Sequence, residues 1–334
     1  MMRGILVKAL GDPHVMKMAE IPIPKISPNE VLVRVDYAGV NPVDTYVRAG
    51  TFGRSPPLPY TPGKDGAGTV ERVGAKVRHV APGDKVFFCS MFSDGGHGSY
   101  AELAVAEENE VWPLPGGDSS LGAALGTPYL TAYRALITKG RCTKGETVLV
   151  HGGSGAVGQA CVQIAKNEGL RVIATAGSAE GLDILRELGA DLVLDHKLSD
   201  DRKIAELKER APSGLDIIVE MRADLNLGTD CQVIGKKGRI LVVGNRGSTT
   251  LDARFLMFPE ASISGVAILA ATKDEFRDAS KYVSDGVREG WARPNISKIY
   301  SLESAPQAHI DIIESRGGAT GKLLLDVAAS LKNG

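Results

Sequence analysis

The sequence predicts an α/β protein in which a doubly wound parallel sheet is inserted into a second, smaller domain of short β-strands. Three observations indicate this class. The chain has 334 residues, more than one domain usually holds. From about Glu146, apolar strands alternate with helical segments, which is typical of a parallel sheet covered on both faces. A last apolar strand follows the helical tail, and it needs another sheet to pair with.

The amino-terminal part has the pattern of short strands separated by turns. Apolar residues nearly alternate over residues 30–36, and β-rich runs bounded by glycine and proline follow at residues 66–74 and 83–88. These runs predict a small, irregular β-barrel. We expect residues 1–123 to form this substrate domain and residues 270–334 to complete it, with residues 124–269 as the inserted domain.

The inserted domain repeats a strand, a turn and a helix. Its apolar strands are separated mostly by segments of helical character, so we expect neighbouring strands to run parallel. The tail has helical stretches at residues 274–288 and 305–314 before its final strand at residues 322–327. The strands of the insert are expected at residues 147–150, 171–175, 191–194, 215–219, 239–243 and 263–266.

Composition and charge argue against several classes of function. A formal net charge of -1 provides no basic field that would attract nucleic acid. The amino terminus has an apolar run of only three residues, Ile5 to Val7, before Lys8, too short for a signal peptide, and no stretch is apolar enough to cross a membrane. Four separated cysteines, Cys89, Cys142, Cys161 and Cys231, fit a reducing compartment. We therefore expect a soluble cytoplasmic protein without disulfides.

A glycine-rich turn is the strongest local signal. The strand at residues 147–150 leads into Gly152, Gly153, Gly155 and Gly158, and a helical run follows. Glycines let the backbone turn sharply and approach a pyrophosphate, while the start of a helix offers unpaired N–H groups and the positive end of a dipole. Because further strand and helix units come after it, the turn predicts a Rossmann domain that binds a dinucleotide.

The end of the second strand of the insert determines which dinucleotide fits. An acidic residue there would hold the ribose 2′-hydroxyl of NAD and repel a 2′-phosphate. This sequence has small residues at 174–178 and no acid, and Ser178 and His196 could donate hydrogen bonds to a phosphate. The pattern favours NADPH. An alternative interpretation of His196 is an exposed loop residue without a ligand.

Zinc ligands are absent from the places where zinc-dependent alcohol dehydrogenases carry them. The run Gly39-Val40-Asn41-Pro42-Val43-Asp44 stands where a cysteine would, and the run Pro62-Gly63-Lys64-Asp65-Gly66 replaces a His-Glu pair, so no metal is expected. A metal-free site suits an acceptor that is already electrophilic and needs only hydrogen-bond donors for its developing oxyanion. Asn41 and Tyr46 are the candidate donors. Asn41 could instead only shape a turn, and Tyr46 could be an ordinary half-buried aromatic.

Four segments along the whole chain carry a family resemblance. They are GVNPVDTY at residues 39–46, LPYTPG at 58–63, PYLTAYRAL at 128–136 and GGATGK at 317–322. Together they resemble the zeta-crystallin-like quinone oxidoreductases, a zinc-free branch of the medium-chain dehydrogenase/reductase superfamily. The resemblance implies a GroES-like barrel, an inserted Rossmann domain, NADPH as cofactor and a quinone as substrate.

The resemblance also implies site residues. Tyr46 and Asn41 would be catalytic, with Tyr46 near the nicotinamide. Each further cofactor contact would lie where a parallel strand ends or a helix begins. These contacts would be Ser154, Gly155, Ala156, Val157, Gly177, His196, Asn226, Val243, Gly244, Asn245, Arg246, Val266, Ala267 and Ile268.

Other functions are open at this point. A reductase of 2-alkenals or enones would use the same cofactor without a metal. The resembled family also includes a lens crystallin and proteins that bind A/U-rich RNA, although the balanced charge makes nucleic acid a poor main ligand. The resemblance further implies a homo-oligomer, either a dimer or a tetramer.

Overall fold

The computed structural model describes residues 1–53, 56–92, 96–315 and 318–332. Contacts divide the chain into two compact units. Unit 1 contains Met1–Leu130, Thr272–Arg316 and Gly321–Gly334, and unit 2 contains Thr131–Ala271 and Gly317–Thr320. Unit 2 is therefore inserted into unit 1. Gly317, the first residue of the fourth resembling segment, lies outside the described residues.

Unit 2 is built on a parallel sheet of six strands in the order β10-β9-β8-β11-β12-β13. Every neighbouring pair is parallel, so the expected doubly wound sheet is confirmed. Its central strands are mostly apolar and mostly buried, which is typical of a parallel sheet packed against helices. The strands are β8 (Thr147–Val150), β9 (Arg171–Ala176), β10 (Leu192–Asp195), β11 (Leu215–Glu220), β12 (Ile234–Val242) and β13 (Ser262–Gly265).

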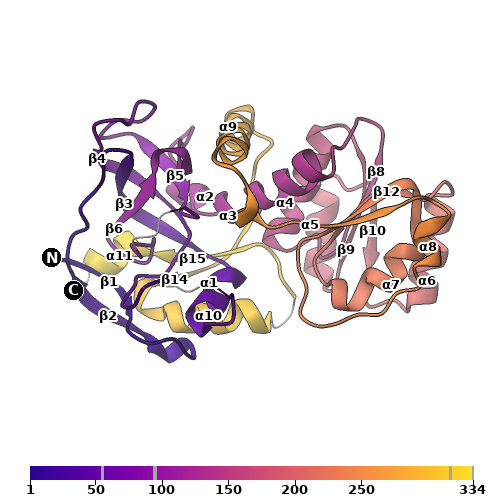
Figure 1. The fold of residues 1–334 in the computed structure, drawn as a ribbon, viewed down its shortest axis with the longest axis horizontal. Coiled ribbons are helices and arrows are strands. Elements are labelled where there is room, and N and C mark those ends of the chain that lie inside the picture. Colours follow the sequence, from indigo (N-terminus) through magenta and orange to yellow (C-terminus); the bar gives the residue numbers. More distant parts are fainter. Residues whose placement is uncertain (54–55, 93–95, 316–317, 333–334) are drawn as a thin grey trace. The chain divides into compact units, whose positions relative to one another are not determined.

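The helices of unit 2 form two groups. α4 packs on β8 and β9, and α5 packs on β9 and β10, whereas α7 packs on β11, β12, α6 and α8. Figure 1 shows α6, α7 and α8 gathered together beside the sheet. The bounds are η3 (Arg134–Lys139, a π-helix), α4 (Ala156–Asn167), α5 (Ala179–Glu187), α6 (Asp200–Arg210), α7 (Ala223–Val233), α8 (Arg254–Met257) and η4 (Ile268–Ala270).

Unit 1 contains a mainly antiparallel sheet of seven strands in the order β14-β15-β3-β4-β5-β7, with β6 also paired to β3. Strand β3 has eleven residues, which is enough to pair with β4, β6 and β15. A separate ribbon of β1 and β2 adds to the unit. The strands are β1 (Met2–Val7), β2 (Met16–Ile21), β3 (Glu30–Val40), β4 (Asp65–Val73), β5 (Lys85–Cys89), β6 (Leu103–Glu107), β7 (Val111–Pro113), β14 (Ile296–Ser301) and β15 (Lys322–Asp326).

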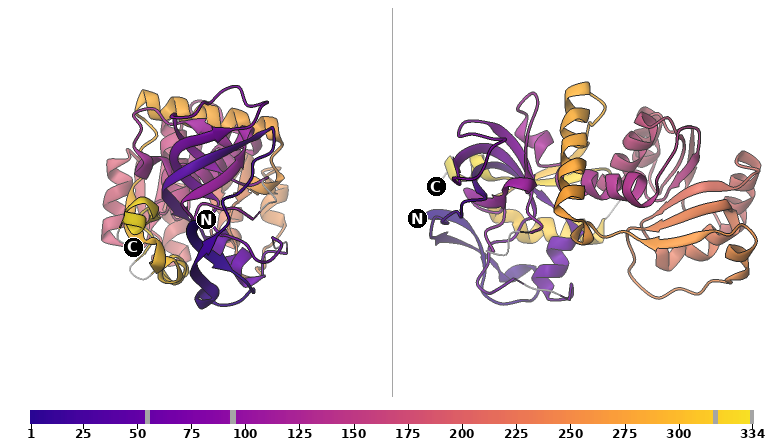
Figure 2. Two further views of the ribbon diagram at one scale, coloured as in Figure 1. Left: turned by 90° about the vertical axis from the view of Figure 1, so that its left-hand side faces the viewer. Right: turned by 45° about the horizontal axis from the view of Figure 1, so that its top comes forward.

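The carboxy-terminal strand returns to the first unit, as the sequence predicts. β15 runs antiparallel to β3 and parallel to β14, so it lies inside the sheet. In both views of Figure 2 the indigo amino-terminal ribbon and the yellow carboxy-terminal helix belong to the same unit. This return brings Lys322, the first residue of β15, next to segments that are far away in sequence.

Unit 1 also contains helices, of which α1 is not predicted by the sequence. α1 has only eight residues and begins at Pro42, a residue that fits the first turn of a helix. The predicted helices at 274–288 and 305–314 are confirmed as α9 and α10. The bounds are η1 (Pro13–Val15), α1 (Pro42–Ala49), η2 (Glu108–Glu110), α2 (Ser119–Gly122), α3 (Gly126–Tyr133, whose last three residues belong to unit 2), α9 (Lys273–Glu289), η5 (Leu302–Ser304), α10 (Ala305–Glu314) and α11 (Val327–Lys332).

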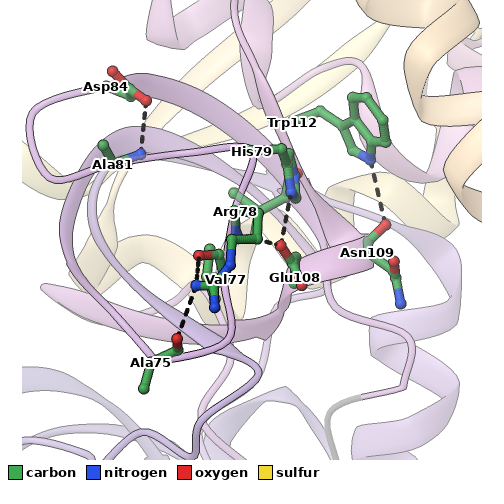
Figure 3. Close-up of polar contacts among 10 residues, drawn as sticks. Ala75, Val77, Arg78, His79, Ala81, Asp84, Glu108, Asn109 and Trp112 are labelled. Atoms are coloured by element: carbon green, nitrogen blue, oxygen red, sulfur yellow. Dashed lines mark hydrogen bonds and ion pairs between the residues drawn. The ribbon is translucent and has the colours of Figure 1, made fainter.

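The loop between β4 and β5 is tied to η2 by polar contacts. The Arg78 backbone N–H donates to Glu108 Oε1 at 2.6 Å, and the Arg78 guanidinium donates to the carbonyls of Ala75 and Val77. The ring centroids of His79 and Trp112 are 5.2 Å apart. Figure 3 shows the polar contacts of this loop. These contacts attach the loop to η2 and β7 within unit 1.

The unit boundaries differ slightly from those expected from the sequence. Residues 124–130 group with unit 1, because the Thr127 backbone and hydroxyl both donate to Asp65 Oδ1. Residues 318–320 group with unit 2, where the Ser154 hydroxyl donates to the Ala319 carbonyl at 2.7 Å. Within the described ranges, no helix combines the length and apolarity needed to span a bilayer.

Candidate active site

The residues expected to contact a cofactor in unit 2 gather at one edge of its sheet. Parallel strands all end at the same edge, and open α/β sheets bind their ligands there. The structure therefore brings these positions together along the ends of neighbouring strands. Ser154 to Val157 follow β8, Gly177 follows β9, His196 follows β10, Asn226 follows β11, Val243 to Arg246 follow β12, and Val266 to Ile268 follow β13.

The glycine turn leads directly into α4. Gly155 is the N-cap of this helix and has no side chain that could cap it, so the first N–H groups of α4 are available to an anion. Gly158 allows the helix to pack closely on the turn, since a Cβ there would lie 2.3 Å from the Gly152 carbonyl oxygen. A bare N-cap before a helix of twelve residues fits the pyrophosphate of a dinucleotide.

The ends of β9 and β10 lie against each other. A Cβ at Gly177 would come within 2.1 Å of His196 Nε2, so the imidazole lies directly on this glycine. The side chain of Ser178 accepts a hydrogen bond from the Gly181 N–H at 3.1 Å and caps α5, and its own hydrogen can still be donated. Ser154 donates its hydroxyl hydrogen to the Ala319 carbonyl, so its backbone N–H is the donor that it can offer to an anionic ligand.

The ends of β11 and β12 are held by hydrogen bonds inside unit 2. Asn226 Nδ2 donates to Glu220 Oε1 at 3.1 Å, which orients this amide. Gly244 lies so close to Met221 that a Cβ would be 2.3 Å from its carbonyl oxygen. The Arg246 backbone N–H donates to Asp224 Oδ1, and Asn245 is exposed.

A buried group of His151, Glu220 and Asp230 lies beside the glycine turn. His151 Nε2 is 2.8 Å from Asp230 Oδ1 and 3.5 Å from Glu220 Oε2. Burial, opposed by His151 and reinforced by Asp230, raises the pKa of Glu220 to about 7. Burial alone would lower the pKa of His151, but Asp230 and then Glu220 outweigh it, so this pKa is raised. Among the described residues, this is the one group of three His, Cys, Asp or Glu side chains close enough to hold a metal ion.

In unit 1 the candidate catalytic residue Asn41 is part of a buried polar cluster. Its Nδ2 donates to Asp65 Oδ2 at 2.9 Å, and its Oδ1 accepts from Lys322 Nζ at 2.5 Å. Lys322 Nζ also donates to Asp65 Oδ2 at 2.7 Å. Asn41 therefore does more than shape a turn, because it joins β4 and β15 at the start of α1.

The other polar residues of α1 differ in their surroundings. Asp44 is buried and accepts the Asn41 backbone N–H at 2.9 Å. Burial, and then Asp65, raises the pKa of Asp44 to about 7, so it can be neutral near physiological pH. Tyr46 is half-buried on the same helix. Tyr46 and Asn41 lie in unit 1, whereas the other candidate residues lie in unit 2.

Sequence reasoning missed several residues of these clusters. Lys322 and Thr127 join the Asn41 cluster, and His151, Glu220 and Asp230 form the second cluster. A lysine directly before the apolar run of β15 is a signal that could have identified Lys322, because a charged residue next to a buried strand needs a partner. The partners themselves could not be identified from a single sequence.

Comparisons with known proteins agree with this geometry. The family described as "Alcohol dehydrogenase GroES-like domain" matches residues 27–116, and the family described as "Zinc-binding dehydrogenase" matches residues 156–285. Quinone oxidoreductase of Rattus norvegicus is 44% identical over 97% of this chain and 98% of its own length. Quinone oxidoreductase of Homo sapiens is 43% identical with the same coverage.

Solved structures show the same fold. An NAD-dependent alcohol dehydrogenase superimposes with a TM-score of 0.88 at 31% identity, covering 98% of this chain and all of its own. The mycobacterial protein Rv1454c, solved in complex with NADPH, gives a TM-score of 0.85 at 26% identity, covering 97% and 99%. The expected fold, a Rossmann sheet inserted into a GroES-like domain, is confirmed. This chain is an oxidoreductase and belongs to the quinone oxidoreductase family of the medium-chain dehydrogenase/reductase superfamily.

Proposed function

We propose that this protein uses NADPH to reduce quinones in a site that needs no metal. The single observation that carries the proposal is the line of candidate residues along the carboxyl edge of the parallel sheet, where the bare N-cap of α4 can receive a pyrophosphate. Relatives named quinone oxidoreductase, more than 40% identical over nearly the whole chain, support a quinone as substrate.

The choice of NADPH rests on the end of β9. The run Gly177-Ser178-Ala179 that follows this strand has no acidic side chain of the kind that holds the ribose 2′-hydroxyl of NAD and repels a 2′-phosphate. The exposed His196 ring on Gly177 and the Ser178 hydroxyl are donors on the same side. When bound, the nicotinamide supplies a hydride or single electrons, and the chain's own residues hold and orient the two reactants.

On the acceptor side, Asn41 and Tyr46 are the proposed donors to the quinone oxygen. A hydrogen-bond donor aimed at an oxygen that gains negative charge stabilises the transition state more than the ground state. The segments that contain Asn41 and Lys64 stand where zinc ligands would be. The Asn41 amide oxygen already accepts from Lys322, and the Lys64 ammonium has no lone pair for a metal, so neither is a usual zinc ligand. The donor set therefore supports an electrophilic acceptor.

We further propose that the protein forms a homo-oligomer through the β13 edge of its sheet. β13 is the terminal strand, its residues are largely exposed, and a Cβ at Gly265 would meet nothing within 4 Å. Phe258 and Met257, which precede it, are 92% and 70% exposed. An open strand edge beside exposed apolar side chains fits a second copy of the same edge.

The function is tested by steady-state kinetics on metal-stripped protein. Ortho- and para-quinones, an enone and a 2-alkenal are offered with NADPH or with NADH. We expect turnover of quinones with NADPH and a lower kcat/KM with NADH. Activity on alkenals alone would contradict the quinone assignment, and zinc-dependent recovery of activity would contradict the metal-free site.

His196 provides a test of cofactor choice. The variant His196→Asp places a carboxylate beside the proposed 2′-phosphate, so we expect kcat/KM for NADPH to fall by about tenfold or more relative to NADH. The control is His196→Asn. Asparagine has the size of aspartate without its charge, so this variant should retain most of the preference for NADPH over NADH. If the NADPH/NADH ratio is the same in wild type and in His196→Asp, His196 does not contact the phosphate.

A further inference from the structure

The position of Lys322 is unusual because a lysine side chain is almost never fully buried. Lys322 is 2% exposed and its partner Asp65 is 0% exposed. A buried ion pair costs desolvation energy, which is offset only when both charges have well-placed partners. The chain makes room for this contact, since a Cβ at Gly39 would lie 2.8 Å from Lys322 Cε.

The Asp65 carboxylate is fixed on both of its oxygens. Oδ1 accepts from the Thr127 N–H at 2.8 Å and from the Thr127 hydroxyl at 2.7 Å. Oδ2 accepts from Asn41 Nδ2 at 2.9 Å and from Lys322 Nζ at 2.7 Å. A carboxylate offers about four acceptor sites, and these four bonds use them. Asp65 therefore holds α1, α3 and β15 at one point.

This arrangement leaves the Asn41 amide a single orientation. An ammonium can only donate and a carboxylate can only accept, so Oδ1 must face Lys322 and Nδ2 must face Asp65. Nδ2 carries two hydrogens, and one of them goes to Asp65. For the second, no acceptor is found within the described part of the chain.

The ammonium also changes how well Asn41 donates. A hydrogen bond accepted from a cation at the amide oxygen polarises the amide, and bonds in such chains strengthen one another by about 10–30%. This polarisation is largest in a site closed to water, and the side chains of Asn41, Asp65 and Lys322 are at most 3% exposed. The remaining Nδ2 hydrogen is thus a strengthened donor.

We propose that Lys322 is the positioning residue of the acceptor site: its buried ammonium fixes the Asn41 amide so that one Nδ2 hydrogen is held for the carbonyl oxygen of the quinone. The inference rests on the proposed function, in which Asn41 donates to the substrate. Lys322 itself contacts Asn41 and Asp65, and it acts on the substrate only through Asn41.

A double-mutant cycle tests this dependence. Asn41→Leu is expected to lower kcat with 1,4-benzoquinone by about 100-fold, the usual effect of losing one oxyanion donor. Lys322→Met is expected to lower kcat by about tenfold, with KM for NADPH unchanged. In the Asn41→Leu background, Lys322→Met should cost less than about twofold, because the two residues act as one unit. Losses that multiply would overturn the proposal.

Two further variants serve as controls for the double-mutant cycle. Lys322→Met leaves the Asp65 charge buried alone, so Lys322→Met with Asp65→Asn supplies a neutral cluster that can fold if the single variant does not. Lys298→Met is the matched control, since it removes an exposed lysine from the neighbouring strand β14 and should leave kcat unchanged.

A second readout does not depend on turnover. Hydrogen exchange of the Asn41 side-chain amide, followed by nuclear magnetic resonance, should be slow in wild type and at least about tenfold faster in the variants lacking Lys322. Unchanged exchange would overturn the proposal whatever the activity. Absence of quinone turnover in wild type would instead contradict the proposed function, and the exchange rates would still decide the role of Lys322.

Discussion

At the scale of single residues, Asp44 links stability to pH. Its pKa is raised from 3.8 to about 7 in the folded protein by burial and then by Asp65. Between these values the folded state retains a proton that the unfolded state has lost, so stability falls as pH rises from about 4 to about 7. At about 1.36 kcal/mol per pKa unit, this loss is about 4 kcal/mol.

The variant Asp44→Asn should remove this loss. An asparagine oxygen can still accept the Asn41 N–H, so the start of α1 is retained. We expect the difference in unfolding free energy between variant and wild type to shift by up to about 4 kcal/mol in favour of the variant between pH 4 and pH 8. Urea unfolding at a series of pH values measures it. Asp201→Asn, on an exposed turn of α6, is the control, and parallel pH profiles for Asp44→Asn and wild type would disprove the linkage.

What the sequence shows of the site depends on distance along the chain. Asn41 can be selected from the sequence because it is a hydrogen-bond donor in the local run, residues 39–44, that stands where a metal ligand would. Lys322 is 281 positions away from Asn41, and only the return of β15 to β3 brings the two together. His151 and Glu220 meet because β8 and β11 are parallel neighbours, and Asp230 comes from α7, which packs on β11; a single sequence does not specify these contacts.

At the scale of elements, the glycine turn separates stability from nucleotide binding. A Cβ at Gly158 would lie 2.3 Å from the Gly152 carbonyl oxygen, whereas one at Gly155 would meet only atoms at 3.5 Å and beyond. Gly158→Ala should therefore lower the unfolding free energy by about 1–3 kcal/mol through overpacking. Gly155→Ala should change the unfolding free energy by less than about 0.5 kcal/mol. It should lower the affinity for NADPH, because the added methyl group would lie where the pyrophosphate comes close to the backbone.

The two glycine variants are matched, since each adds one methyl group to the same turn. Thermal unfolding and titration of NADPH fluorescence measure the two effects independently. Equal loss of stability in both variants would show that the turn is sensitive as a whole. Undiminished NADPH affinity in Gly155→Ala would place the pyrophosphate elsewhere.

Elements with a regular pattern could be predicted from the sequence, and those defined by tertiary contacts could not. The strands of the insert are continuous apolar runs, so β8 was located to the residue. The sequence does not predict α1, because eight residues are too few to show a helical repeat of apolar positions. Its apolar residues Val43, Tyr46 and Val47 are also of types that are common in strands. β12 begins at Ile234, five residues before its predicted start, because Lys236 and Lys237 interrupt the apolar pattern without ending the strand.

At the scale of the whole molecule, the chain order itself indicates the insertion. The final strand has no neighbour of its own in the tail except β14, so joining β3 is the way it can be buried. The sequence could not show that residues 318–320 group with the inserted unit, because the contact between Ser154 and Ala319 spans 165 positions.

The assembly of the chain through β13 can be measured by sedimentation. If β13 pairs with a second copy, the protein should sediment as a dimer of about 70 kDa, twice the 35.2 kDa chain, or as a multiple of it. Replacing Met257 and Phe258 with lysine puts like charges from both copies at this edge, and we expect the dissociation constant to rise by about 100-fold or more. Ile23→Lys, at a residue 44% exposed in unit 1, is the control. A wild-type monomer at micromolar concentration, or a dimer unaffected by the two lysines, would exclude β13 as the contact, because an interface cannot hold those charges without losing affinity.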